Sequence, residues 1–348
     1  MRKVPELRFD GYDGEWEEKK LGDSFTVTMG QSPNSENYTV DSDFLPLIGG
    51  NTDIKQGKIN PSIFTTQETK KSYPGNIIMT VRAPVGDLAM NSSEVVIGRG
   101  VCSIDGDNYL YYNLEKKKYE NYWRRFISGS TFESINSSDI KSVLISTPKN
   151  SEQEKIGDLF KKIDDLIEIQ EGKVSKLEDF KKSMLQKMFP KKGELVPEFR
   201  FVGFDNYGFD KGKINDFIVT HGSKNYIKQP ADVGTYKVIQ QGDIPIAGYS
   251  NDEPYKDFSN VILFGDHTLS LFKPYEPFLL STDGIKIIFI ENIDREYFYY
   301  LVQHVMPESQ GYKRHYKILR AVKVNIPKSY KEQQKIGQFF KNLDAQIE

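Results

Sequence analysis

The residues best suited to chemistry in this sequence are cationic and amide side chains gathered in short segments. The densest segment is 312–323, whose charged side chains are all basic: Lys313, Arg314, His315, Lys317, Arg320 and Lys323. Lys and Arg neutralise phosphates, whereas Arg, Lys, Asn and Gln hydrogen-bond to base edges in the major groove of DNA. We therefore predict that this segment contacts DNA, with a solvated basic face as the alternative.

Polar loops and lone arginines elsewhere have the same chemistry. Arg82 ends a predicted strand and Arg99 lies between two glycines, so both are further candidates for DNA contact, with an ion pair inside the fold as the alternative. The other candidates lie in two loops, where an ordinary turn is the alternative, and in a glutamine pair: Gln31, Ser32, Asn34, Ser223, Lys224, Asn225, Tyr226, Gln240 and Gln241.

Catalytic constellations are missing from the sequence, so we expect no enzyme activity in this chain. Its four histidines lack the spacing of a zinc site, and it contains neither a P-loop nor the Asn/Asp-Pro-Pro-Tyr/Phe motif of amino-methyltransferases. Asp283 and Lys286 resemble a fragment of a metal-nuclease core, but no second carboxylate has suitable spacing. Cys102 is the only cysteine, which excludes a disulfide framework and favours a reducing, cytoplasmic compartment.

The composition allows hydrophobic cores, but the net charge of the whole molecule does not favour binding to anionic partners. The 348 residues leave room for two or three domains, and 38% of them are hydrophobic. A net charge of −2 does not attract DNA or an anionic membrane, so any nucleic-acid surface must be local. No apolar run approaches the roughly 18 residues of a membrane span. The first residues lack the apolar region of a signal peptide.

A heptad pattern over residues 148–192 must position these candidates. Ile156, Ile163, Gln170, Leu177 and Met184 recur every seven residues, which predicts a coiled-coil helix roughly 55–60 Å long. An ordinary long core helix is the alternative. The side chains that we expect to pair two helices are Ile156, Phe160, Ile163, Ile167, Val174, Leu177, Met184, Ile336, Phe340, Leu343 and Ile347.

The chain is an internal repeat. Residues 4–9 and 196–201 share Val-Pro-Glu-(Leu/Phe)-Arg-Phe, and the start of the long helix recurs near Lys335-Ile336-Gly337. We therefore predict a first globular domain over 1–147, a helix over 148–192, a second domain over 193–328 and the start of a second helix over 329–348. β-favouring runs predict strands at 25–29, 44–48, 76–82, 95–97, 236–239, 261–264, 268–272 and 285–290. We also predict helices at 110–127 and 297–305.

This layout resembles the specificity subunit of type I restriction-modification enzymes. The segment 147–167, with Glu-Gln followed by Lys-Ile-Gly-x-x-Phe, is similar to that family's helix signature, and Gly30-Gln-Ser-Pro33 resembles its Gly-x-Ser-Pro. Residues 75–82 and 97–101 also resemble the sequences of strands and adjoining turns that are usual in this family. The resemblance implies an α+β fold: two similar mixed α/β target-recognition domains, joined by long helices that pair as an antiparallel coiled coil with pseudo-twofold symmetry.

The resemblance also implies a function and partners. Each domain would read one half of a bipartite target in double-stranded DNA, and the helices would set the gap and dock two methylation subunits. This chain would hold no cofactor; partner subunits would carry S-adenosylmethionine, and restriction/translocase subunits would use ATP and Mg²⁺. A coiled-coil scaffold with protein-binding modules is the alternative. Because the second helical run is short, we expect Leu343 and Ile347 to cover only part of the first helix's seam.

Overall fold

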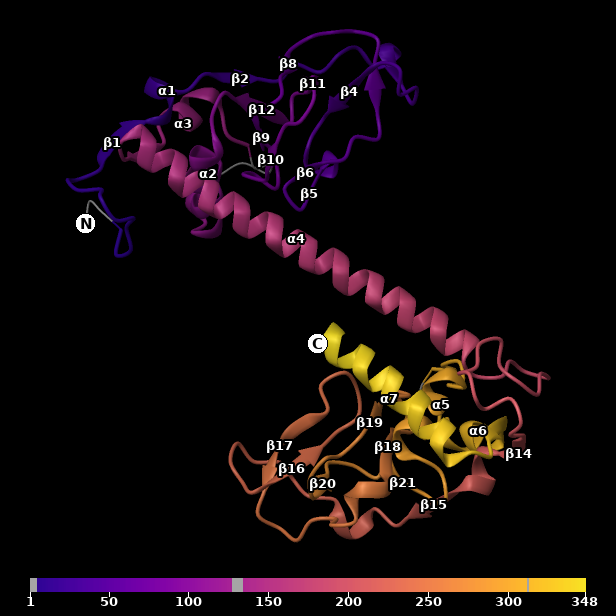
Figure 1. Cartoon of the computed structure of the whole chain (residues 1–348). Coiled ribbons are helices and arrows are strands. Elements are labelled where there is room, and N and C mark those ends of the chain that lie inside the picture. Colours follow the sequence, from indigo (N-terminus) through magenta and orange to yellow (C-terminus); the bar gives the residue numbers. More distant parts are fainter. Residues whose placement is uncertain (1–4, 127–133, 312) are drawn as a thin grey trace. The chain divides into compact units, whose positions relative to one another are not determined.

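The computed structural model describes residues 5–126, 134–311 and 313–348 and divides into two compact units, Met1–Ile169 (unit 1) and Gln170–Glu348 (unit 2). The long helix α4 (Asn150–Lys187) belongs to both, because its first part lies in unit 1 and its last part in unit 2 (Figure 1). Each unit combines small β-sheets with a few helices, which is the mixed α/β composition expected from the sequence.

Unit 1 is built around an antiparallel four-stranded sheet in the order β10-β9-β12-β2. Every residue of β9 and β12 is buried, because both faces of the sheet are covered. Ile77 and Met79 pack in a core that includes residues of helix α2 (Asn108–Tyr119), whereas Ile78 belongs to a second core that includes residues of the neighbouring sheet. The strands are β2 (Val27–Met29), β9 (Ile77–Thr80), β10 (Leu88–Met90) and β12 (Val101–Ile104).

The second sheet of unit 1 contains a pair of parallel strands that matters for a binding site. Its strand order is β3-β7-β4-β11-β8, and β4 (Leu45–Ile48) and β11 (Val95–Ile97) run parallel with Ile48 opposite Ile97. The loops that follow these two strands therefore leave the same edge of the sheet. The remaining elements are β3 (Tyr38–Thr39), β5 (Ile54–Lys55), β6 (Lys58–Ile59), β7 (Phe64–Thr65), β8 (Lys71–Ser72), α1 (Leu21–Ser24) and α3 (Ser137–Lys141).

Unit 2 repeats the order of elements found in unit 1. It has a four-stranded sheet β15-β21-β18-β19 and a three-stranded sheet β17-β16-β20, in which β16 and β20 run parallel. The strands are β15 (Ile218–His221), β16 (Tyr236–Ile239), β17 (Ile246–Ser250), β18 (Val261–Gly265), β19 (Leu271–Phe272), β20 (Phe278–Leu280) and β21 (Ile285–Ile290). The helices are α5 (Arg295–His304), α6 (Tyr316–Ala321) and α7 (Tyr330–Ile347).

Most predicted elements are confirmed, with two corrections. The predicted strand 268–272 is reduced to β19, because Leu269 adopts a positive φ of 61° and its N–H closes a turn on the Gly265 carbonyl. The predicted helix 110–127 ends at Tyr119 and is followed by the 3-10 helix η3 (Tyr122–Phe126), while residue 127 lies outside the described residues.

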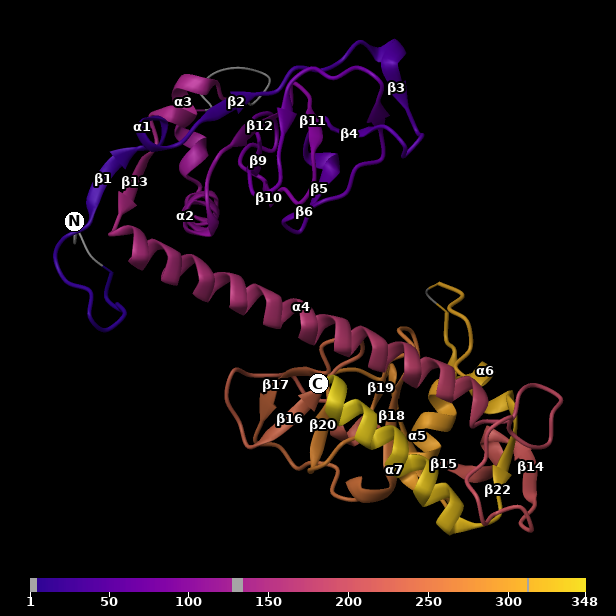
Figure 2. The same ribbon diagram turned by 45° about the horizontal axis from the view of Figure 1, so that its top comes forward.

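The repeated opening segments join the start of each unit to its closing helix. In unit 1, β1 (Glu17–Lys20) pairs with β13 (Leu144–Thr147), and in unit 2, β14 (Phe209–Lys213) pairs with β22 (Lys323–Pro327) (Figure 2). The repeated arginine makes a two-pronged ion pair in both: Arg8 Nε lies 2.7 Å from Glu152 Oε1, and Arg200 Nε lies 2.6 Å from Glu332 Oε1. Both glutamates are fully buried. The ion pair explains why the opening segment, which carries the arginine, and the start of the helix, which carries the glutamate, are repeated together.

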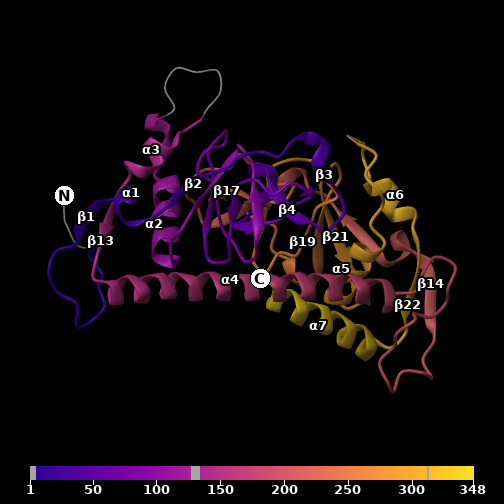
Figure 3. The same cartoon turned by 90° about the horizontal axis from the view of Figure 1, so that it is seen from above.

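The predicted helix seam is paired only in part. In unit 2 the end of α4 runs antiparallel to α7 (Figure 3), and Leu177, Met184, Phe340 and Leu343 share one core. The prediction of one continuous seam is corrected for the first half of α4. There Ile156 packs on the core of unit 1 and Phe160 contacts the ring of Tyr112.

The middle of the seam stays open to solvent. Ile163 and Ile167 keep 41% and 51% of their surface exposed, while Val174, Ile336 and Ile347 are half-buried or buried. The expectation that α7 covers only part of the seam is therefore confirmed.

Candidate nucleic-acid interface

A small polar pocket lies in unit 1 where β4 and β11 end. It measures about 260 Å³ and brings together three of the predicted contact residues, Ser32, Arg82 and Arg99. Arg99 follows β11, beside the loop that follows its parallel neighbour β4. Arg82 and Ser32 follow β9 and β2 of the antiparallel sheet and are brought there by hydrogen bonds from the Val81 N–H to the Gly100 carbonyl and from the Gln31 N–H to the Ile97 carbonyl. The complete lining is Ser32, Gly49, Gly50, Asn51, Arg82, Ala83, Arg99 and Gly100.

The loops around the pocket are locked together by close backbone contacts. A Cβ on Gly100 would lie 2.1 Å from the carbonyl oxygen of Gly49, so only glycine permits this approach. The buried Asp53 carboxylate accepts a hydrogen bond of 2.7 Å from the Gly49 N–H, and the Ser32 hydroxyl accepts one of 3.0 Å from the Arg99 N–H. These contacts hold the backbone that carries Arg99.

The side chains of Arg82 and Arg99 are exposed at this pocket. Neither guanidinium has an ion pair or hydrogen bond to another described residue, so the alternative of an ion pair inside the fold finds no support there. Two guanidinium groups without a partner in the described part of the chain attract an anionic or acceptor-rich ligand, and their planar forks fit a phosphate or the edge of guanine.

The other two predicted contacts of this loop lie beside the pocket. Gln31 and Asn34 are exposed, and their backbone groups are fixed within unit 1. The Gln31 N–H donates to the Ile97 carbonyl over 2.8 Å, and the Asn34 N–H donates to the Gln67 side chain over the same distance. Their own side chains carry amides on a rigid loop, which is the arrangement that base reading requires.

In unit 2 the corresponding strand ends carry different residues. Gln240 and Gln241 follow β16 as Gly49 and Gly50 follow β4, and they are half-buried. The Gln241 side-chain oxygen accepts from the His267 N–H at 3.1 Å, and its NH₂ faces the Thr282 hydroxyl at 3.5 Å. Gln240 donates to the Ile244 carbonyl at 3.0 Å. These amides hold loops together, and their contact with DNA stays a prediction.

The second predicted polar loop, residues 223–226, is only partly exposed to solvent. Lys224 and Asn225 are exposed in the 3-10 helix η5 (Lys224–Tyr226), whereas Ser223 and Tyr226 are half-buried. The Tyr226 ring packs edge-on against Tyr255 with centroids 5.2 Å apart. Lys224 and Asn225 are therefore the two members of this set that reach solvent freely.

The basic segment before β22 requires a correction. His315 is fully buried, and both ring nitrogens are used: Nδ1 donates to the Asp266 carbonyl and Nε2 accepts from the Gln310 N–H, each at 3.0 Å. The prediction that His315 contacts DNA is therefore wrong, because its ring is a core hydrogen-bonding group. Residue 312 lies outside the described residues.

The remaining cations of that segment are exposed but not equally free. Arg320 donates to the Asn215 side chain over 2.6 Å, and Arg314 approaches Asp283 to 3.8 Å with both side chains mostly in solvent. Lys313 and Lys317 are exposed on the same stretch. These four positions supply local positive charge in unit 2.

Sequence reasoning missed the residues that shape the pocket. Asn51 and Asp53 were not among the predicted contacts, and the structure makes Asn51 part of the lining and Asp53 its anchor. The available signal was Gly49-Gly50 directly after an apolar strand, a pattern that also precedes close backbone approaches.

No group of His, Cys, Asp or Glu among the described residues is arranged to hold a metal ion. In the same described ranges, no helix is long and apolar enough to cross a membrane.

The fold and the pocket define a class: a binding protein made of two copies of one mixed α/β unit on a long helix. Comparison with known proteins identifies it further. The family model of the type I restriction modification DNA specificity domain matches residues 13–179 and again 206–348. The chain therefore belongs to this family and contains the domain twice.

Individual relatives agree with the family. A putative type I restriction enzyme MjaX specificity subunit from Methanocaldococcus jannaschii is 32% identical over 177 residues, which cover 49% of this chain and 42% of that protein. The MjaIX specificity subunit of the same organism is 30% identical over 168 residues, or 44% of this chain and 39% of the relative. Each match thus covers less than half of the relative's length.

A solved structure supports the fold. The crystal structure of the S subunit of a type I restriction-modification system from M. genitalium matches with a TM-score of 0.69 at 16% identity, covering 99% of this chain and 93% of that one.

Proposed function

We propose that this chain is the DNA-sequence-recognition subunit of a type I restriction-modification complex. Unit 1 and unit 2 would each read one half of a bipartite, asymmetric target in double-stranded DNA. The observation that carries this proposal is the duplicated specificity domain, which in unit 1 presents two exposed arginines beside exposed amides. Because the strand ends of the two units carry different side chains, the two half-sites should differ in sequence.

The same proposal assigns the chemistry to other subunits. Two methylation subunits would carry S-adenosylmethionine, and restriction/translocase subunits would use ATP and Mg²⁺, so that this chain binds no cofactor and catalyses no reaction. The charged and apolar surface of α4 supports docking of the methylation subunits, since Leu166 and Ile169 are 66% and 67% exposed. We place the complex in the cytoplasm, with the DNA it would bind.

A domain exchange tests the division of labour. Residues 14–147 would be replaced by the corresponding region of another specificity subunit, and the methylated sites would be determined by sequencing genomic DNA of cells that carry the complete system. We expect one half-site to change while the other half-site and the gap stay the same. A change in both half-sites would refute the assignment of one unit to each half.

Substitution of the two arginines tests the pocket. Arg82→Ala and Arg99→Ala should each weaken binding of the intact target by about 1–3 kcal/mol, because each removes a charge-assisted contact. Arg124→Ala removes the same charge from an exposed position outside the pocket and serves as the matched control. Titration at several salt concentrations measures the effect.

The pattern of the loss distinguishes two kinds of contact. A contact to a base should relax specificity at one position of the half-site, whereas a contact to phosphate should weaken all sequences alike and lower the salt slope by about 1. Unchanged affinity and slope in both variants, relative to Arg124→Ala, would remove the pocket from the DNA interface.

A further inference from the structure

One turn occupies the same place in both units and differs in charge between them. It joins β11 to β12 in unit 1 and β20 to β21 in unit 2. In unit 1 it begins with a hydrogen bond of 2.8 Å from the Gly98 N–H to the Ile48 carbonyl, at the end of the parallel strand β4. In unit 2 it begins with one of 2.8 Å from the Ser281 N–H to the Ile239 carbonyl, at the end of the parallel strand β16. The parallel pair therefore places this turn at the same sheet edge in each unit.

The far end of the turn is equivalent as well. The Gly100 carbonyl accepts a hydrogen bond of 2.9 Å from the Val81 N–H, directly after β9. The Gly284 carbonyl accepts one of 2.8 Å from the Asp266 N–H, directly after β18. Because both ends are tied to the same neighbouring strands, the side chains between them can be compared position by position.

The side chains at these positions differ in charge. Between the two tied ends, unit 1 has Arg99 alone, whereas unit 2 has Thr282 and Asp283. By the same hydrogen bonds, Arg82 of unit 1 corresponds to His267 of unit 2. Unit 2 thus has neither arginine of the unit 1 pocket at these positions, and its turn presents a carboxylate where the turn of unit 1 presents a guanidinium.

The backbone of the unit 2 turn is held in place, while the Asp283 carboxylate can change partners. The Lys286 ammonium donates to the Asp283 carbonyl at 2.6 Å, and the Gln241 side chain faces the Thr282 hydroxyl at 3.5 Å. The Asp283 side chain keeps 72% of its surface exposed, and it lies 3.8 Å from the guanidinium of Arg314, which is 64% exposed. An ion pair at this distance in solvent is weak.

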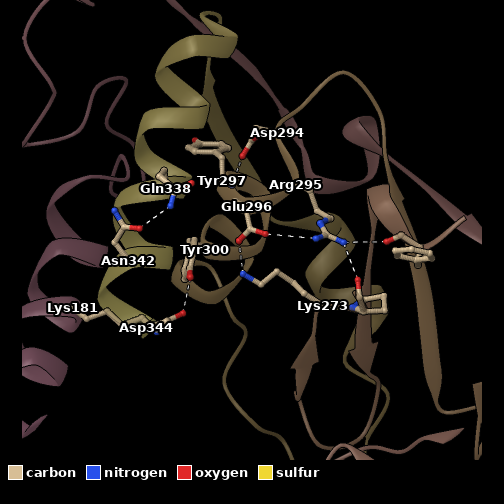
Figure 4. Close-up of polar contacts among 12 residues, drawn as sticks. Lys181, Lys273, Asp294, Arg295, Glu296, Tyr297, Tyr300, Gln338, Asn342 and Asp344 are labelled. Carbon is tan, nitrogen blue, oxygen red and sulfur yellow. Dashed lines mark hydrogen bonds and ion pairs between the residues drawn. The ribbon is translucent and has the colours of Figure 1, made fainter. Parts of the chain in front are cut away.

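A carboxylate that stabilises the fold of unit 2 has different surroundings. Figure 4 shows Glu296 between Lys273, at 2.5 Å, and Arg295, at 3.7 Å. These three side chains are nearly buried, with at most 16% of their surface exposed. Asp283, by contrast, extends into solvent from a fixed turn, which is the position of a residue that contacts a ligand.

The negative charge limits what Asp283 can contact on DNA. A carboxylate repels phosphates, so it is suited only to base edges that donate hydrogen bonds. In the major groove these donors are the amino groups of cytosine and adenine, and the adenine edge sets the acceptor N7 beside its amino group. The guanine amino group lies in the minor groove, which is about 6 Å wide and has phosphates on both sides. Cytosine is therefore the base that fits a carboxylate best.

We propose that Asp283 determines specificity in unit 2 by accepting a hydrogen bond from the amino group of a cytosine in the major groove. Arg314 beside it would offset part of the repulsion between the carboxylate and the phosphates. The half-site of unit 2 would then contain at least one G·C pair. This inference rests on the proposed function, because it assigns a base to a unit that must first read DNA.

The target sequence gives the first test. Sequencing of methylated sites in cells that carry the complete system defines both half-sites, and the exchange of residues 14–147 shows which of them belongs to unit 2. We expect a G·C pair in the half-site of unit 2. A half-site made only of A·T pairs would overturn the inference and leave the proposed function intact.

Substitutions at position 283 give the sharper test. The chain assembled with its methylation subunits would be titrated with duplexes that carry each of the four bases at each position of this half-site. Asp283→Asn should move the preference at one position from cytosine toward adenine, and Asp283→Arg should move it toward guanine at the same position, because an amide and a guanidinium fit those edges. We expect both variants to bind the native target at least about fivefold more weakly than wild type.

Asp210→Asn is the matched control. Asp210 lies 3.7 Å from Lys328 in an ion pair of similar exposure, but it belongs to β14, in the strand pair that joins unit 2 to its helix. This variant should keep both the affinity and the base preference of wild type. The half-site of unit 1 is the internal reference for folding, because its base preferences should stay the same in every variant.

The pattern of the change decides the outcome. An equal loss for all sequences in the Asp283 variants would overturn the inference, because the carboxylate would then only hold Arg314 in place. An unchanged preference for the native base in both variants would also overturn it. If the wild-type complex bound all sequences alike, the proposed function would be refuted and this inference with it.

Discussion

The two units repeat most closely on their helical side and differ most at their strand ends. On the helical side the same contacts occur twice: Arg8 with Glu152 and Arg200 with Glu332, and Lys155 and Lys335 each over two aromatic rings. At the strand ends, Gly49 and Gly50 of unit 1 correspond to the linked Gln240 and Gln241 of unit 2, and the two arginines of the unit 1 pocket have no partner among the described residues. The shared contacts attach each unit to its helix, and the divergent positions are available to recognise different ligands.

The difference also separates two kinds of glycine. Gly157 and Gly337 allow a helix to cross closely in both units, so they belong to the shared scaffold. Gly49 and Gly100 allow loops to meet only in unit 1, where they form a pocket. Substitutions can therefore test whether the scaffold is equivalent in the two units while the strand ends are not.

The largest effect should come from the buried ion pairs. Arg8→Met leaves the fully buried Glu152 carboxylate without its partner, and we expect the free energy of unfolding of unit 1 to fall by about 3 kcal/mol. That value is at the lower end for a buried pair, because Arg8 keeps 18% of its side chain exposed. Arg200→Met should have the same effect on unit 2.

Tryptophan fluorescence can assign these losses to a unit. Both tryptophans, Trp16 and Trp123, lie in unit 1, so urea unfolding followed by fluorescence reports unit 1 and circular dichroism reports the whole chain. Lys19→Met, which removes an exposed pair with Glu17, is the control and should change stability by less than about 1 kcal/mol. If Arg8→Met changed the free energy of unfolding as little as Lys19→Met, the two units would not share one mode of attachment to their helices.

A smaller effect should come from the glycines at the helix crossings. Gly157→Ala and Gly337→Ala each place a Cβ within 2.7 Å of backbone, so we expect a destabilisation of about 1–3 kcal/mol in the corresponding unit. Gly172→Ala, on the same helix with no atom within 4 Å, should instead stabilise by up to about 1 kcal/mol through helix propensity. Opposite signs at positions 157 and 172 are the result to look for in urea unfolding. Equal signs would mean that the close crossing is not a real constraint.

Much of this architecture could be predicted from the sequence, because periodicity and repetition report local structure and duplication directly. The heptads predicted α4, and the shared opening and helix segments predicted the duplication, but the ion pairs that join them were not predicted. The pairing of the seam could not be predicted, because Ile156 and Phe160 belong to the same heptad pattern as Leu177 and Met184 but pack in unit 1 instead of unit 2.

The candidate site could be predicted only by residue type. Arg82, Arg99 and Ser32 follow strands of two different sheets, and the sequence gives no sign of which strands are neighbours. His315 was wrongly predicted to contact DNA, because the sequence does not distinguish a buried histidine between basic residues from an exposed one. Gln241 was predicted as a reader, and the structure uses its amide to link three loops of unit 2.

The smallest expected effect is a pH dependence of unit 2 that comes from His304, whose ring stacks on Phe189. Burial against Phe189 lowers the pKa of His304 below its ordinary 6.5, partly opposed by backbone hydrogen bonds at Pro190 and Leu185. Because the unfolded chain binds the proton more readily, stability is complete above pH 6.5 and falls as the pH drops from there toward the folded-state pKa.

Replacing the ring isolates this contribution. His304→Phe keeps an aromatic ring for the stack on Phe189 but cannot titrate, so the wild type should lose more stability than the variant between pH 7.5 and 5.5, by less than about 1 kcal/mol. Urea unfolding followed by circular dichroism measures the difference, with Trp fluorescence of unit 1 as the internal reference. Unit 1 has Lys116 in place of this histidine, and its transition should not shift between the two proteins. An identical pH dependence in wild type and variant would mean that packing against Phe189 does not desolvate His304.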